Sequence, residues 1–286
     1  MLERTFIHLD GVGPWTERSF WAAGVETWAD VLEGRCPESA RRFRPQIEES
    51  ARRLDAADAV FFHGSLPPSE RWRLYADFLP SAAFVDIETT GLTPDYHVIT
   101  MVGVLDREGF TAYVRGEGLD DLPAALRRYR LVVTFNGARF DLPFLRAEFG
   151  RSGQGDLLDH AAHVDLMHVL RRIGFRGGLK AIERRLGVGR AAELGDLDGF
   201  DAVRLWRMAQ EGEPGAVATL IRYNAEDVAS LPRLGAQAVR ALARGTPLER
   251  AAVWPFPELD TSPLPYDRSL VEYLRERKAY RPFAPR

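Results

Sequence analysis

The chain has 286 residues, a net charge of −3, 45% hydrophobic residues and a single cysteine, Cys36. No apolar run approaches the roughly 18 residues that cross a bilayer, so we expect no membrane partner, and one cysteine excludes an internal disulfide framework. The slightly acidic balance gives no global argument for a nucleic-acid partner. The first residues lack the apolar stretch of a signal peptide, so we expect a cytoplasmic location.

Residues 1–58 are predicted to form a small helical module with a connector. Two short helices are expected at Thr16–Ala23 and Thr27–Leu32, after a glycine-containing turn. The turn and the first helix resemble a helix-hairpin-helix motif, in which Gly11 and Gly13 would let backbone N–H groups approach a nucleic-acid phosphate. Hairpins of this kind also serve only for packing, so both interpretations stay open.

Residues 59–245 are predicted to form the main domain, and residues 246–286 a proline-rich C-terminal arm. A long helical pattern at 216–242 contains Pro232, which removes a backbone donor and should split the helix near Ser230. Strands followed by helices indicate an α/β fold with a mixed sheet flanked by helices. The expected strands are Ala83–Ile87, Val98–Leu105, Phe110–Val114 and Leu131–Phe135, and a later helix is expected at about 164–172.

The strongest functional signal is the segment Asp86-Ile87-Glu88-Thr89-Thr90-Gly91-Leu92, which begins in the first expected strand. Side chains two apart in a strand point to one face, so Asp86 and Glu88 project together. Neighbouring carboxylates at the end of an apolar strand repel each other and lose solvation, and a divalent cation removes both costs. Hard oxygen ligands of this kind suit Mg²⁺ or Mn²⁺. Two solvated acids at a strand end are the alternative for D-x-E alone, but the longer motif is far more specific.

Two further segments carry acids that can join this pair. Asp141 follows Asn136-Gly137 at an expected strand end and lies at the start of the next helix, where its alternative role is to cap that helix. Tyr223 and Asp227 are four residues apart and therefore share one helix face. The alternative for this second pair is an ordinary exposed helix surface.

In chain order, the motifs D-x-E, N-x-x-x-F-D and Y-x-x-x-D resemble those of the DEDD (DnaQ-like) superfamily of RNase H-like 3′–5′ exonucleases. The tyrosine marks the DEDDy branch. Wider features, among them Val164–His168 and Gly178–Gly187, look like the YprB-like ribonuclease H-like domain proteins. The resemblance covers residues 60–235 and implies an RNase H-like sheet. Phe135 stands where many relatives have histidine, a departure that leaves every metal ligand in place.

The resemblance implies hydrolysis of phosphodiester bonds with two Mg²⁺ or Mn²⁺ ions. Asp86 would bridge both ions, and Glu88 and Asp227 would complete the site that activates water. Asp141 would support the second ion. Tyr223 would orient the attacking water, because a phenol that titrates near roughly 10 is a weak base.

Nucleic-acid contacts are expected from a basic segment that begins at Arg171 and from the motif N-x-x-x-F-D, which begins at Asn136. A solvated helix face is the alternative for the basic segment. The residues expected to contact nucleic acid are Asn136, Arg171, Arg172 and Lys180, with a single-stranded DNA or RNA end as the substrate. The histidines between His160 and His168 imitate a zinc site, but their spacing and the lack of a nearby cysteine argue against it.

The competing function is a nucleic-acid-binding or scaffold protein that keeps the fold without turnover. A missing or substituted ligand would favour this alternative. All four acids are present, so the sequence favours the enzyme.

Overall fold

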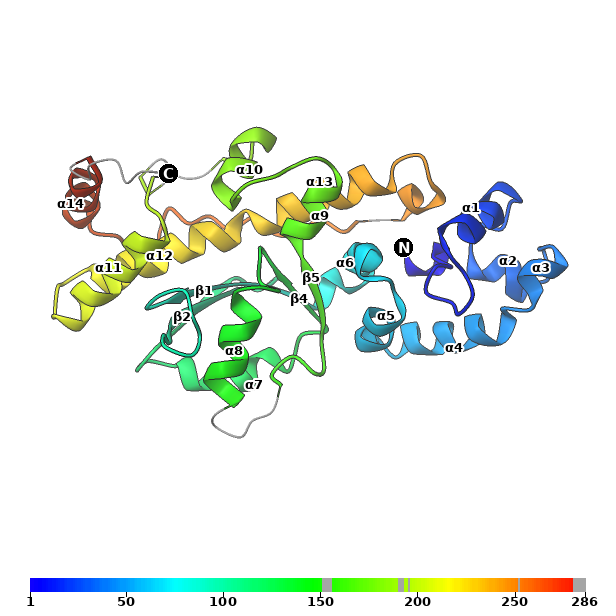
Figure 1. The fold of residues 1–286 in the computed structure, drawn as a ribbon, viewed down its shortest axis with the longest axis horizontal. Helices are drawn as coiled ribbons and strands as arrows, with labels where there is room; N and C mark the ends of the chain where they lie inside the picture. Colours follow the sequence, from blue (N-terminus) through cyan, green and yellow to red (C-terminus); the bar gives the residue numbers. More distant parts are fainter. Residues whose placement is uncertain (151–155, 190–192, 195, 252, 280–286) are drawn as a thin grey trace.

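The computed structural model describes residues 1–150, 156–189, 193–194, 196–251 and 253–279. Figure 1 shows a central sheet between a group of N-terminal helices at one end of the molecule and helix α14 at the other. None of the helices within the described residues is long and apolar enough to span a membrane.

The sheet has five strands in the order β3-β2-β1-β4-β5. The pairs β1–β2 and β2–β3 are antiparallel, whereas β1–β4 and β4–β5 are parallel. The carboxyl ends of β1, β4 and β5 therefore meet at one edge of the sheet. The strands are β1 (Ala82–Thr89), β2 (Ile99–Leu105), β3 (Phe110–Val114), β4 (Leu131–Thr134) and β5 (Ala162–Asp165).

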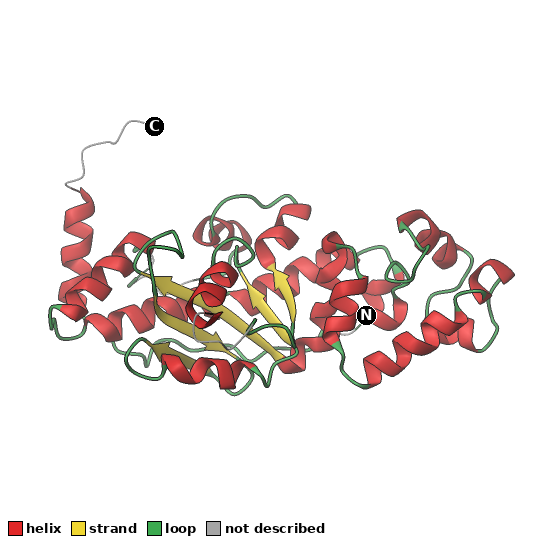
Figure 2. Cartoon of the chain, turned by 60° about the horizontal axis from the view of Figure 1, so that its bottom comes forward, coloured by secondary structure: helices red, strands yellow, loops and turns green. Residues whose placement is uncertain are grey.

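Helices cover both faces of this sheet (Figure 2), so the predicted α/β fold with a mixed, helix-flanked sheet is confirmed. Val85 and Ile87 of β1 pack in the cluster that contains Phe144 of α8, whereas Phe84 packs in the cluster of α6, α9 and α13. Alternation along β1 thus sends Asp86 and Glu88 toward the second layer, where α12 contacts β1 and β2. These helices are α6 (Leu74–Phe78), α7 (Leu122–Leu126), α8 (Asp141–Gly150), α9 (Leu166–Arg172), α10 (Leu179–Leu186), α11 (Gly199–Gln210), α12 (Ala216–Ala229) and α13 (Leu231–Ala243), with the 3₁₀ turns η3 (Leu79–Ser81) and η4 (Leu119–Asp121).

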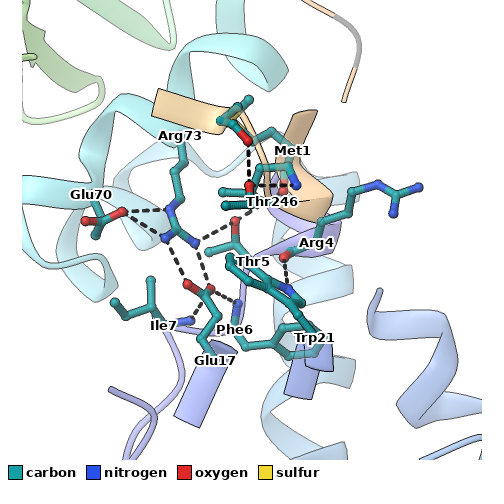
Figure 3. A network of polar contacts seen from close by, with 12 residues as sticks. Met1, Arg4, Thr5, Phe6, Ile7, Glu17, Trp21, Glu70, Arg73 and Thr246 are labelled. Carbon is teal, nitrogen blue, oxygen red and sulfur yellow. Dashed lines mark hydrogen bonds and ion pairs between the residues drawn. The ribbon is translucent and has the colours of Figure 1, made fainter. Parts of the chain in front are cut away.

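The N-terminal helices are joined to the main domain by a shared core and a buried ion network. Phe62 packs on Phe78 and on Trp28, so apolar contact is continuous across residue 58. Arg73 forms a two-pronged ion pair with Glu17, at 2.7 and 2.9 Å (Figure 3). The predicted boundary at residue 58 stays a prediction. The elements here are η1 (Leu2–Arg4), α1 (Pro14–Ala22), α2 (Trp28–Leu32), α3 (Glu38–Arg41), α4 (Arg44–Asp55), α5 (Ala59–Ser65) and η2 (Pro68–Arg73).

The C-terminal arm runs back along the main domain after η5 (Pro247–Arg250) (Figure 1). Phe256 lies edge-on to Phe84 of β1, with ring centroids 4.9 Å apart. The last described element of the arm is α14 (Arg268–Ala279), whose apolar face packs with α11 and α12. The last part of the predicted arm, 280–286, lies outside the described residues.

Two sequence expectations about helices have different outcomes. The long pattern splits into α12 and α13 at Ser230, as Pro232 predicts. The helix expected at 164–172 is wrong in its first part, because Ala162–Asp165 forms β5 and the helix begins at Leu166. The side chain of Asp165 accepts a hydrogen bond from the Met167 amide and so caps the helix where the strand ends.

Candidate active site

Three acids from distant parts of the chain converge at the carboxyl end of β1. Asp86 and Glu88 lie on β1 and Asp227 on α12, and one carboxylate oxygen from each lies within 4.8 Å of the others. Within the described residues, this is the group of histidine, cysteine or acidic side chains whose geometry suits a metal ion. Asp227 therefore points toward Asp86 and Glu88.

Close contact between α12 and the antiparallel strands brings these acids together. Gly103 of β2 is the register partner of Asp86, and a Cβ at that glycine would lie 1.7 Å from Oδ1 of Asn224. Gly103 thus makes the room that α12 needs to approach the sheet. Val228, the next residue after Asp227, is fully buried and fixes the helix rotation.

Asn224 is a site residue that the sequence reasoning missed. Its Nδ2 donates hydrogen bonds to Oδ2 of Asp86 at 2.8 Å, to the Asp86 carbonyl at 3.3 Å and to Oε1 of Glu88 at 3.4 Å. Asn224 is fully buried, so these bonds hold both carboxylates in a fixed orientation. Its position three residues before Asp227, on the same helix face, was the signal that could have found it.

Burial and like charge act together on Glu88. This side chain is 7% exposed, and burial raises its pKa well above the ordinary value, with a further rise from the charge of Asp227. The Asn224 hydrogen bond and the charge of Lys180 oppose this rise in pKa. A buried carboxylate beside another acid favours a bound cation or a proton.

Asp141 lies at the first residue of α8, outside the group of three acids but close enough for its charge to raise the pKa of Glu88. Asp141 is 2% exposed, and its Oδ1 has no hydrogen-bond partner among the described residues. Burial raises the pKa of Asp141 to about 8, with a further rise from the charge of Asp165. Such a buried, unsatisfied oxygen matches the role expected of a second-ion ligand.

Tyr223 and Lys180 lie beside the acids. Tyr223 lines the same cavity as Asp86 and Asp227. The Lys180 ammonium lies 4.8 Å from the centroid of the Tyr223 ring and donates a hydrogen bond to the Leu197 carbonyl. Lys180 thus links the tyrosine to the segment that enters α11.

The cavity over the acids has a volume of about 500 Å³. Its acidic wall is Asp86, Glu88 and Asp227, and a second wall comes from the start of α11. Apolar side chains line the remainder of this cavity: Leu92, Phe140, Phe200 and Val203. One compartment therefore offers oxygen ligands beside an apolar surface.

The other predicted contact residues lie apart from this cavity. Asn136 adopts a left-handed backbone conformation, with φ +65°, and its backbone N–H donates a hydrogen bond to the Asp165 carboxylate. Gly11 (φ +81°) and Gly13 form the turn before α1 in the N-terminal module, far from the sheet edge (Figure 1). Their nucleic-acid contacts stay predictions. Arg171 and Arg172 end α9, where Arg172 pairs with Glu70 at 3.0 Å.

The histidines that imitate a zinc site have separate partners. His160 contacts the Leu126 carbonyl at 2.9 Å, and His163 contacts the Thr134 hydroxyl at 2.9 Å. His168 lies 3.8 Å from Asp165. Among the described residues, these side chains do not form a group that could hold one metal ion.

A family model described as the RNase H superfamily matches residues 83–239, which is more than half of the chain. The chain belongs to the RNase H superfamily, whose members typically use divalent metals. This membership supports a function in nucleic-acid cleavage.

Solved structures with a similar chain trace include two nucleic-acid enzymes. The family B DNA polymerase from the hyperthermophilic archaeon Pyrobaculum calidifontis is 18% identical, with a TM-score of 0.47, over 61% of this chain and 27% of the polymerase. A structure described as the apo form of a nuclease is 20% identical, with a TM-score of 0.42, over 73% of this chain and 92% of that one. A search of curated proteins finds no match.

Proposed function

We propose that the chain is a metal-dependent nuclease that hydrolyses phosphodiester bonds, acting as a 3′–5′ exonuclease of the DEDDy, YprB-like type. The observation that carries this proposal is the convergence of Asp86, Glu88 and Asp227 beside a cavity of about 500 Å³. A purely structural helix–sheet contact would not gather three acids, because their mutual repulsion and desolvation oppose it.

The donor set fits two hard divalent cations. Asp86, Glu88 and Asp227 would hold the first, with Asp86 shared between both, and the unsatisfied oxygen of Asp141 would support the second. Carboxylate oxygens alone favour Mg²⁺ or Mn²⁺ over zinc. The chemistry that such a pair supplies is polarisation of the phosphate, activation of water and neutralisation of the leaving oxygen.

The protein's own groups orient the reactants. Asn224 fixes the two strand carboxylates through its hydrogen bonds. Tyr223, which lines the cavity, would orient the attacking water, and Lys180 beside its ring would attract the phosphate. Phe140 and Phe200 would contact the terminal base, since every nucleobase offers a face for stacking. A single-stranded DNA or RNA end suits this arrangement.

The test uses the purified full chain with end-labelled single-stranded DNA and RNA, in Mg²⁺, Mn²⁺ or EDTA. A 3′–5′ exonuclease shortens a 5′-labelled strand one nucleotide at a time and releases mononucleotides from a 3′-labelled strand. We expect cleavage in Mn²⁺ or Mg²⁺ and none in EDTA. Asp86→Asn should lower the rate by more than about a hundredfold, which is the upper end of the loss found for outer partners of metal ligands.

Asp120→Asn is the matched control, because Asp120 is an exposed acid in η4, whose Leu119 packs with Val85 and Ile87 on the face of β1 opposite to the acids. It should cleave at the unaltered rate. Full activity in Asp86→Asn, with circular dichroism equal to that of the parent, would refute the site. Binding of nucleic acid without any cleavage would favour the non-catalytic alternative.

A further inference from the structure

A second cleft lies at the same edge of the sheet as the acids, beyond the carboxyl end of β5. Its volume is about 430 Å³, and it is walled by η2, α9 and the loop after β4. Because β1, β4 and β5 are parallel neighbours, β5 lies about 10 Å from β1 across the sheet. The residues that line the cleft include Ser69, Arg71, Ala138, His163, His168 and Arg172.

Arg71 carries a half-buried charge in this cleft without an acidic partner among the described residues. Its Nε donates to the His63 carbonyl at 3.0 Å, which satisfies one donor of the guanidinium but does not neutralise it. Burial lowers the pKa of Arg71, as expected for a cation that has lost solvent and gained no anion. Such a charge is stabilised by an external anion.

The nearby histidines leave Arg71 as the centre of positive charge. Burial lowers the pKa of both His63 and His163 to about 4, so both rings are neutral at pH 7. Neutral rings add no positive charge beside Arg71 and therefore do not repel its guanidinium. His168 has a half-exposed side chain on the cleft wall.

The acids around the cleft are already engaged. Asp165 accepts hydrogen bonds from the backbone amides of Asn136, Ala138 and Met167, at 2.8, 3.1 and 3.0 Å. Glu70 pairs with Arg73 at 2.8 Å and with Arg172 at 3.0 Å. Neither carboxylate is within ion-pair distance of Arg71, so its charge is available to a ligand.

We propose that this cleft is a second phosphate-binding site, in which Arg71, with His168 and Ser69 beside it, holds a phosphodiester of the strand whose end lies at the acids. Phosphate oxygens match the guanidinium fork, and the shared edge of the sheet lets one strand reach both places. The choice of a strand as the source of the phosphate rests on the proposed nuclease function.

The experiment measures fluorescence anisotropy of a 5′-labelled single-stranded oligonucleotide in EDTA, with the full chain carrying Asp86→Asn to prevent cleavage. In this background, Arg71→Gln should weaken binding several-fold at low salt. Loss of one phosphate contact should also make the slope of log K against log salt less negative by about 0.7. Arg71→Lys should keep most of the slope, because the charge is retained.

Arg127→Gln is the control, since Arg127 is exposed at the end of α7, just before β4 begins, at the opposite edge of the sheet. His168→Gln is a milder second variant on an exposed side chain, expected to weaken binding less than Arg71→Gln. Calorimetric titration with inorganic phosphate distinguishes a site that binds free phosphate from a site that binds the phosphodiester of a strand. Equal salt slopes for Arg71→Gln and Arg127→Gln would overturn the proposal. So would an Arg71→Gln variant that loses affinity for inorganic phosphate but binds the oligonucleotide as before.

Failure here can be told apart from failure of the nuclease proposal. A protein that cleaves through Asp86 but has the same salt slope in Arg71→Gln overturns only the second phosphate site. A protein that never cleaves, yet loses slope in Arg71→Gln, overturns only the nuclease.

Discussion

Two clusters of buried charge in this chain are built in opposite ways. Around Arg73, each charge meets its opposite: Glu17 and Glu70 pair with the guanidinium, and Glu70 also pairs with Arg172. The backbone amides of Phe6 and Ile7 donate to Glu17 at 2.7 and 3.0 Å (Figure 3). At the end of β1, by contrast, the acids Asp86, Glu88 and Asp227 lie together. Lys180 is a nearby cation, but its ammonium lies over the ring of Tyr223.

The contrast separates a structural charge cluster from a functional one. A network that neutralises itself needs nothing from solution and holds the N-terminal helices to the main domain. A cluster of like charges is costly until a ligand of opposite sign arrives, and the cost is therefore a sign of binding. Mutations should thus act in opposite directions on the stability of the metal-free protein at the two places.

The largest effect is expected at the self-neutralised network. Arg73→Met leaves Glu17, with a side chain only 3% exposed, without its counter-ion. Removing one partner of a buried pair costs about 3–5 kcal/mol, so the free energy of unfolding in urea should fall by that amount. The double variant Arg73→Met/Glu17→Leu should recover much of the loss. If the double variant instead loses the sum of the losses of the two single variants, the two side chains do not stabilise the protein through their ion pair.

The pH dependence of stability should reveal the opposite behaviour at the acids. The folded-state pKa of Asp141 is raised from 3.8 to about 8, so the metal-free folded protein keeps a proton that the unfolded chain releases. The contribution of protonated Asp141 to the free energy of unfolding is therefore fully present below pH 3.8 and is lost as pH rises through about 8. The free energy of unfolding falls with a slope of at most about 1.4 kcal/mol per pH unit for each such group.

Asp141→Asn removes this contribution, so the difference in unfolding free energy between variant and parent should grow in favour of the variant between pH 4 and 8. Urea unfolding in EDTA at a series of pH values measures it. Asp120→Asn, an exposed acid, is the control and should show a flat difference. A flat difference for Asp141→Asn as well would mean that this carboxyl is solvated or already neutralised.

Metal addition should stabilise the parent by a smaller amount. A ligand that binds only the folded state contributes about 2.7 kcal/mol at a hundredfold excess over Kd. Mn²⁺ should therefore raise the Tm of the parent, and Glu88→Gln should lose most of this rise while being the more stable protein in EDTA. An equal rise in Glu88→Gln would place the bound ion elsewhere.

The features that the sequence predicted correctly depend on local rules. Alternation along β1 placed Asp86 and Glu88 on one face, and helical spacing placed Tyr223 with Asp227, because these relations need only the neighbouring residues. The break at Ser230 was predictable from Pro232 for the same reason.

The features that escaped prediction depend on partners far along the chain. The strand β5 has four residues and exists because β4 offers a parallel edge, so its own pattern is too short to identify it. The role of Asn224 depends on the register that places Gly103 opposite Asp86, and register is a tertiary property. The edge-on contact between Phe256 and Phe84 is likewise absent from local pattern.

The smallest effect, and the finest test of the comparison, concerns Asn224. It carries no charge, so its influence on the acids comes from hydrogen bonds, which orient both carboxylates and favour the charged form of Glu88. Asn224→Leu keeps the number of side-chain heavy atoms and their branching but removes the hydrogen bonds to Asp86 and Glu88, and the affinity for Mn²⁺ should fall by about tenfold, at the lower end of what outer partners contribute. Gly103→Ala should reproduce this loss, because its Cβ would displace the Asn224 amide. Calorimetric titration with Mn²⁺ measures both variants, and an unaltered affinity in Asn224→Leu would mean that the acids orient themselves around the ion without help from α12.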